Sequence, residues 1–100
     1  MRLNGKAKQD FETWVVKNYG FDTTMIHRLS GVLLNALIIE WFDSVGFYLT
    51  ILPCIDKTFD SYITFKEIRK EVCQFQKTRQ EAIIQAILTA NKLYNETNKI

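Results

Sequence analysis

The sequence predicts an α+β fold, in which a small antiparallel sheet packs against amphipathic helices at both ends of the chain. Residues 36–52 have the alternation and the central turn of a β-hairpin, and residues 59–65 alternate like a third strand. Residues 6–19 and 78–94 instead carry apolar residues at helical spacing. One hundred residues with 47% apolar content suffice for a single core, so we expect one α+β domain over residues 1–100.

The N-terminal helix is predicted over residues 6–19. Its apolar residues recur at intervals of three and four, which places them on one face of an α-helix; they are Ala7, Phe11, Trp14 and Val15. Asn4 is a suitable N-cap, and Gly20 can end the helix in the left-handed conformation. Residues 21–35 then predict a loop and one or two helical turns that lead into the first strand.

The predicted hairpin covers about residues 36–52 and turns at residues 43–46. Gly46 supplies the left-handed residue that a three-residue hairpin loop requires. One face of the two strands is wholly apolar and consists of Leu37, Ile39, Trp41, Leu49 and Ile51. The other face is mixed and includes Glu40, Phe42, Tyr48 and Thr50. We expect the apolar face to lie beneath the last helix.

A membrane-spanning helix is the alternative interpretation of the apolar stretch from Gly31 to Ile55. Glu40 and Asp43 lie near its middle, and each carboxylate there costs about 2.5–3.5 kcal/mol. The β-branched and aromatic alternation also favours strands over a helix. We therefore expect no membrane partner and, without a signal peptide, a cytoplasmic protein.

The C-terminal half predicts a third strand followed by a helix. Residues 59–65 alternate and are rich in strand formers. Residues 66–76 are ambiguous, because the stripe of apolar residues favours a helix while a strand stays the alternative. Thr78 and Glu81 have the spacing of a capping box, and an apolar stripe behind them predicts the last helix.

The motifs argue against catalysis. His27 is the only histidine, and Cys54 and Cys73 lack the spacing of metal ligands, so Cys and His cannot supply a four-ligand zinc site. The glycines are too scattered to form a phosphate-binding loop. Glu40 and Asp43 would point to opposite faces of a strand, which prevents them from acting as a carboxylate pair. We expect a protein that is not an enzyme and that uses no cofactor.

Two groups of residues are candidates for an interface. Phe42 and Tyr48, with Glu40 beside them, can offer aromatic contacts on the mixed sheet face. The second group is the basic segment 66–79, which contains Lys66, Arg69, Lys70, Lys77 and Arg79. It can dock nucleic acid, a nucleotide or an acidic protein surface. Alternatively it is a solvated helix face, because acidic residues are interleaved with the basic ones.

Three blocks of the sequence resemble small uncharacterised bacteriophage and prophage proteins: residues 3–12, 40–46 and 78–95. The resemblance implies a phage accessory protein in the cytoplasm of the host cell. Such proteins commonly bind host factors, including components of antiviral defence. The leading hypothesis is therefore a non-enzymatic protein that binds and inhibits or redirects a host protein. The alternative is a protein that binds nucleic acid or a nucleotide signal through residues 66–79; a homo-oligomer stays open in either case.

Overall fold

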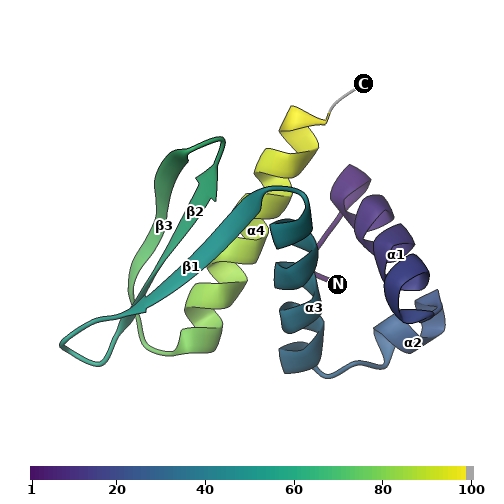
Figure 1. Cartoon of the computed structure of the whole chain (residues 1–100). Coiled ribbons are helices and arrows are strands. Elements are labelled where there is room, and N and C mark those ends of the chain that lie inside the picture. Colours follow the sequence, from purple (N-terminus) through teal and green to yellow (C-terminus); the bar gives the residue numbers. More distant parts are fainter. Residues whose placement is uncertain (99–100) are drawn as a thin grey trace.

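A computed structural model describes residues 1–98. Within these residues the chain forms four helices and one three-stranded sheet (Figure 1). In chain order the elements are α1 (Gly5–Tyr19), α2 (Thr23–His27), α3 (Gly31–Ser44), β1 (Phe47–Pro53), β2 (Phe59–Phe65), β3 (Ile68–Gln76) and α4 (Arg79–Thr97). The predicted α+β class is confirmed, and so are the positions of the N-terminal helix, the strand at residues 59–65 and the C-terminal helix.

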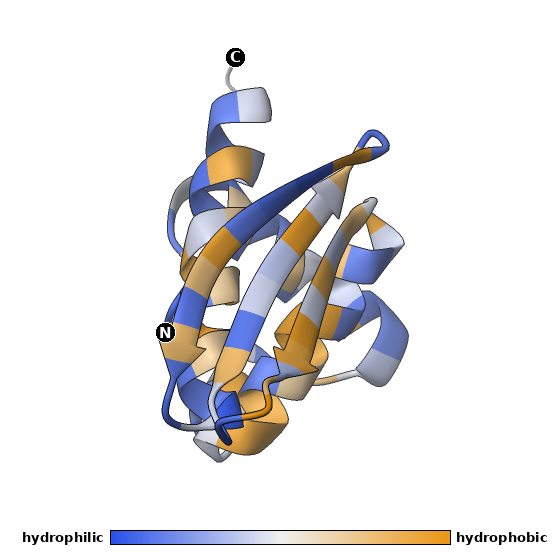
Figure 2. Ribbon diagram, turned by 90° about the vertical axis from the view of Figure 1, so that its left-hand side faces the viewer, coloured by the Kyte–Doolittle hydropathy of each residue, from blue (hydrophilic) through white to orange (hydrophobic). Residues whose placement is uncertain are grey.

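The helices lie on one side of the sheet, whose strand order is β1-β2-β3. Helix α4 contacts all three strands, and α3 packs against β1 and α4. Helix α1 packs against α3 and α4, on the side of α3 that is remote from the sheet (Figure 1). Figure 2 shows the opposite face of the sheet, which no helix within residues 1–98 covers.

Both strand pairs are antiparallel, and the alternation of side chains separates a buried face from an open one. Phe47 pairs with Phe65 and Leu49 with Ile63 on the helix-covered face, where the two phenylalanine rings stack 4.0 Å apart. The residues at the alternate positions point to the open face; they are Tyr48, Thr50, Tyr62 and Thr64. The open face is therefore a mixture of aromatic and hydroxyl side chains.

The predicted hairpin at about residues 36–52 is wrong in its first half, because residues 31–44 form helix α3. Ser30 caps this helix by accepting a hydrogen bond of 3.3 Å from the Leu33 N–H. The segment is apolar at almost every position, so a helical and an alternating pattern fit it equally, and packing against β1 and α4 selects the helix. Gly46 does have a positive φ of 87°, but it joins α3 to β1 instead of closing a hairpin.

Residues 68–76 form strand β3, so the helix favoured for residues 66–76 is wrong. The hairpin turn before β3 consists of Lys66 and Glu67, which both have positive φ. This is the type I′ turn, which is usually predicted from an Asn-Gly pair. The pair Lys-Glu does not predict it. A bulge at Val72 then shifts the register between the pairs Ser61–Cys73 and Tyr62–Glu71. The bulge breaks the alternation, and the remaining apolar spacing imitates a helix.

The core is an aromatic cluster where α1, α3, α4 and β1 meet. The Trp41 ring lies 5.9 Å from that of Phe11 and 4.9 Å from that of Tyr94. Phe42 and Phe47 extend the cluster to the sheet, with ring centroids 5.9 Å apart. The Tyr94 hydroxyl donates to the Asp10 carboxylate at 2.5 Å, which joins α4 to α1. Burial, followed by this hydrogen bond, raises the pKa of Tyr94 above its ordinary value.

Asparagines on α4 cap the first turn of α1. Asn4 occupies the predicted N-cap position, but its own side chain makes no capping bond. The Asn95 Oδ1 accepts from the Ala7 N–H at 2.7 Å, and the Asn91 Oδ1 accepts from the Asn4 N–H at 3.0 Å. The Asn4 Oδ1 in turn accepts from the Nδ2 groups of both α4 asparagines. Residues from the two ends of the chain thus satisfy the Ala7 N–H of the first turn of α1 and the Asn4 N–H directly before it.

Thr78→Ala is expected to lower the free energy of unfolding by about 1 kcal/mol, because the Thr78 hydroxyl accepts from the Glu81 N–H at 3.1 Å at the start of α4. Urea denaturation measures this change. Thr13→Ala is the control, since Thr13 lies in the interior of α1 and bonds only to the Gln9 carbonyl. Equal losses in the two variants would mean that Thr78 does not act as a cap.

No helix within residues 1–98 is both long enough and apolar enough to cross a membrane.

Candidate functional site

The structure separates the three residues predicted to share the mixed sheet face. Phe42 is completely buried in α3, in contact with Trp41, Phe47 and Tyr94, so it cannot meet a partner in the folded state. Tyr48 is 53% exposed on the open face of the sheet. Glu40 is exposed on α3. The predicted grouping is wrong because it depended on pairing residues 36–42 with β1, and those residues are helical.

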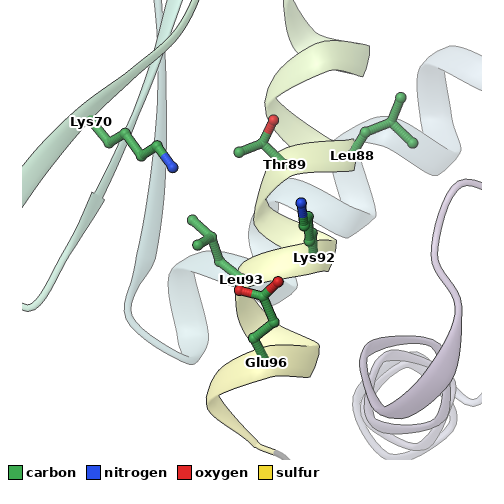
Figure 3. Close-up of a pocket in the computed structure, with 6 residues that line it drawn as sticks. All are labelled: Lys70, Leu88, Thr89, Lys92, Leu93 and Glu96. Carbon is green, nitrogen blue, oxygen red and sulfur yellow. The ribbon is translucent and has the colours of Figure 1, made fainter.

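The basic residues of segment 66–79 do not form one face either, because the segment is extended. Arg69 lies on the open sheet face, with its guanidinium carbon 4.1 Å from the centre of the Tyr62 ring. Lys70 follows it and points to the other side, toward α4 (Figure 3). The remaining members are Lys66 in the β2–β3 turn, and Lys77 and Arg79 after the other end of β3. Since residues seven apart on a strand are separated by roughly 20 Å, one phosphate group cannot engage both ends.

A largely apolar groove runs along α3. We call it the α3 groove; its residues are Tyr19, Phe21, Leu29, Leu33, Ala36, Leu37 and Glu40, and its volume is about 270 Å³. The four members on α3 lie at intervals of three and four, so they form one face of that helix. The end of α1 and the connections on either side of α2 supply the other wall. The Tyr19 ring lies 5.6 Å from that of Trp14 and 5.8 Å from that of Phe21, which gives this wall an aromatic surface.

Apolar side chains at and beside this groove are more than half exposed, which is energetically unfavourable. Leu33 is 57% exposed and its neighbour Val32 is 60% exposed. Full burial of such a side chain stabilises a protein by about 1.5–3 kcal/mol, and α3 forgoes much of that. Scattered apolar residues on a surface are ordinary, whereas a contiguous group in a concave site indicates an interaction surface. The groove is therefore a candidate for binding.

Glu40 closes one end of the α3 groove. The Tyr19 hydroxyl donates to the Glu40 carboxylate, with oxygen–oxygen distances of 2.6 and 2.7 Å. This hydrogen bond, followed by desolvation and the charge of Glu40, raises the pKa of Tyr19. Burial, followed by the same charge, raises the pKa of the Asp43 carboxyl. A helix dipole also disfavours anions near the C-terminus, where both carboxylates lie.

The acidic end of α3 lacks a compensating cation. Within residues 1–98, neither Glu40 nor Asp43 forms an ion pair, and α3 has no basic residue in its last turn. Two neighbouring carboxylates at a helix C-terminus are electrostatically unfavourable. A partner that brings a Lys or Arg side chain to this end of the groove would relieve that repulsion.

Among the described residues, no cluster of three or more His, Cys, Asp or Glu side chains could hold a metal ion. Cys54 and Cys73 are both free and partly buried. The Cys73 sulfur lies 3.0 Å from the Ser61 hydroxyl, inside the sheet. The chemistry of the α3 groove is thus apolar contact combined with one carboxylate.

Comparison with known proteins adds no assignment: no family model matches the chain, and neither a curated protein nor a solved structure matches it. The resemblance to phage proteins stays a prediction.

Sequence reasoning predicted only Glu40 among the groove residues. The missed members come from two places, the region of residues 19–29 and the first turns of α3. One signal was available: residues 31–39 are apolar on every side of a helix. Such a helix is either enclosed in the core or covered by a partner.

Proposed function

We propose that this chain is a non-enzymatic binding protein that docks a partner protein in the α3 groove. In keeping with the resemblance to phage accessory proteins, the partner is a host protein that is inhibited or redirected, such as a component of antiviral defence. The observation that carries the proposal is the contiguous apolar surface that α3 leaves exposed at Val32 and Leu33.

The exposed apolar side chains around the groove favour a protein segment over a metabolite. Sites for small molecules usually have volumes of roughly 300–1,000 Å³ and enclose most of the ligand. The α3 groove holds about 270 Å³, and Val32, which is exposed one turn before the groove residue Ala36 on α3, adds a further apolar side chain. This combination suits one or two anchoring side chains of a protein segment that also covers the surrounding surface.

The charge of the groove defines the chemistry of the partner segment. Glu40 lines one end of the groove and Asp43 follows it on α3, and neither forms an ion pair within residues 1–98; the rest of the lining is apolar or aromatic. An amphipathic segment with apolar anchors at helical spacing, followed by a Lys or Arg, complements this arrangement. The apolar anchors supply most of the affinity, and the ion pair sets the orientation.

Affinity capture from a nuclease-treated host lysate, with quantitative mass spectrometry, tests the proposal. Leu33→Lys places a charge in the groove, and Val16→Lys is the matched control, because Val16 is 50% exposed on α1 and outside the groove. We expect Leu33→Lys to lose the partner at least tenfold, as for an interface hot spot, while Val16→Lys retains it. Circular dichroism checks that both variants fold.

Equal capture by Leu33→Lys and by the control would contradict the groove as the docking site. If instead material is captured only from a parallel lysate without nuclease, or binds with a steep dependence on salt, the protein binds nucleic acid. In that case the basic residues of segment 66–79, and not α3, carry the function.

A further inference from the structure

Strand β3 is an edge strand with an accessible backbone. The sheet order leaves one side of β3 without a partner strand within residues 1–98. Residues 68–71 are all exposed, and Ile68 is 71% exposed. The unpaired N–H and C=O groups of such an edge are a template for another extended chain.

A second groove runs between this edge and α4 (Figure 3). We call it the β3–α4 groove; its residues are Lys70, Leu88, Thr89, Lys92, Leu93 and Glu96, and its volume is about 330 Å³. An apolar cavity of about 160 Å³ adjoins it, shares Lys70 and Leu93 with it, and includes Ile68. The side chains of a strand added to β3 would therefore contact the residues of this groove and would not only face solvent.

The charges of the β3–α4 groove are predominantly positive. Lys70 comes from the strand wall and Lys92 from the helix wall, with Glu96 as the one acidic member. Neither lysine forms an ion pair within residues 1–98. The turn that begins β3 contains Lys66 and Glu67, so it adds no net charge to this end of the strand.

We propose that the free edge of β3 accepts an extended acidic segment of a partner protein as an additional strand. Backbone hydrogen bonds to β3 hold the segment, and its alternate side chains enter the β3–α4 groove. Apolar side chains pack on Ile68 and Leu93, while Asp or Glu side chains pair with Lys70 and Lys92. This surface is separate from the α3 groove, so the protein can hold two segments at once.

A second copy of this chain is a poorer occupant than an acidic segment. Antiparallel pairing of two β3 strands around Lys70 would place like charges opposite one another. Lysine on an edge strand is also a common device against self-pairing. Lys70 thus disfavours pairing with a second copy of the chain and favours pairing with an acidic strand.

Selection from a display library of random dodecapeptides on the immobilised full chain tests this inference. We expect the enriched peptides to lack proline and to carry apolar residues together with Asp or Glu at every second position, because these positions share the face that enters the groove. In fluorescence polarisation, the combined variant Lys70→Glu and Lys92→Glu should bind them at least tenfold more weakly. Lys57→Glu, in the β1–β2 connection, and Leu33→Lys should both leave this affinity unchanged.

N-methylated peptides test whether the segment binds as an added strand. N-methylation of alternate residues of a selected peptide should abolish binding for one set of residues and spare the other, because only one set of N–H groups faces β3. The inference is overturned if no peptide is enriched, if the enriched peptides are neutral or basic, or if the doubly substituted chain binds them as well as the original. Tolerance of N-methylation at every position would overturn it as well.

Discussion

Phe42→Ala is expected to lower the free energy of unfolding by about 3–5 kcal/mol, which is a large part of the stability of a domain of this size. The Phe42 side chain is completely buried, and its ring lies 4.7 Å from Trp41 and 5.9 Å from Phe47. Its removal leaves a cavity between α3 and the sheet that fixed backbone elements on both sides cannot fill. Urea denaturation followed by tryptophan fluorescence measures the loss.

Tyr48→Ala is the matched control, because it also removes an aromatic ring but from the open sheet face, where 53% of Tyr48 is exposed. We expect this variant to cost about 1 kcal/mol or less. If the two variants were equally destabilised, Phe42 would not be a core residue and the position of α3 would be in error.

Asn91→Ala is expected to lower the free energy of unfolding by about 1–3 kcal/mol. Asn91 is only 7% exposed, and its side chain both accepts from the Asn4 N–H and donates to the Asn4 Oδ1. Without it, the Asn4 N–H directly before α1 loses its partner at a partly buried site. Denaturation measures the stability, and faster hydrogen exchange at the first turn of α1 identifies the cause.

Asn18→Ala provides the comparison for Asn91→Ala. Asn18 is exposed near the end of α1 and donates only to the Trp14 carbonyl. We expect it to change stability by about 0.5 kcal/mol or less. A loss as large as that of Asn91→Ala, or unaltered exchange at residues 4–7, would mean that α4 does not cap α1.

The elements that were predicted correctly are those for which only one periodicity fits the sequence. In α1 and α4 the charged residues interrupt every pattern except the helical one, and Gly20 and Thr78 mark the ends. In β2 the partial alternation over residues 59–65 and their strand-forming side chains favour a strand. Local sequence therefore specifies these three elements.

The predictions for residues 36–44 and 66–76 are wrong for different reasons. Helix α3 is apolar on all sides, so no periodicity can be read from it, and contacts with β1 and α4 decide its structure. Strand β3 does not alternate between buried and exposed residues, because the bulge at Val72 shifts its register, and its turn of Lys66 and Glu67 is not one that usually signals a hairpin. Both errors affected candidate interface residues. Phe42, which was expected on the surface, lies in the core, and Lys70 and Arg69 lie on opposite faces of the sheet.

The α3 groove could not be predicted from the sequence because its walls come from segments that no local pattern connects. Tyr19 and Glu40 are joined by a hydrogen bond across 21 positions, and this contact depends on how α1 packs against α3. Glu40 was selected as an interface residue for its place on a strand that does not exist. It belongs to the groove because of the helical spacing that links it to Leu33 and Leu37.

Hydrogen–deuterium exchange of the chain with and without its captured partner tests most directly whether α3 is the docking site. The proposal predicts slower exchange over residues 31–40 and residues 19–29, with no change on β1 and β2. Protection confined to the open sheet face around Tyr48 and Tyr62, with residues 31–40 unaffected, would contradict it.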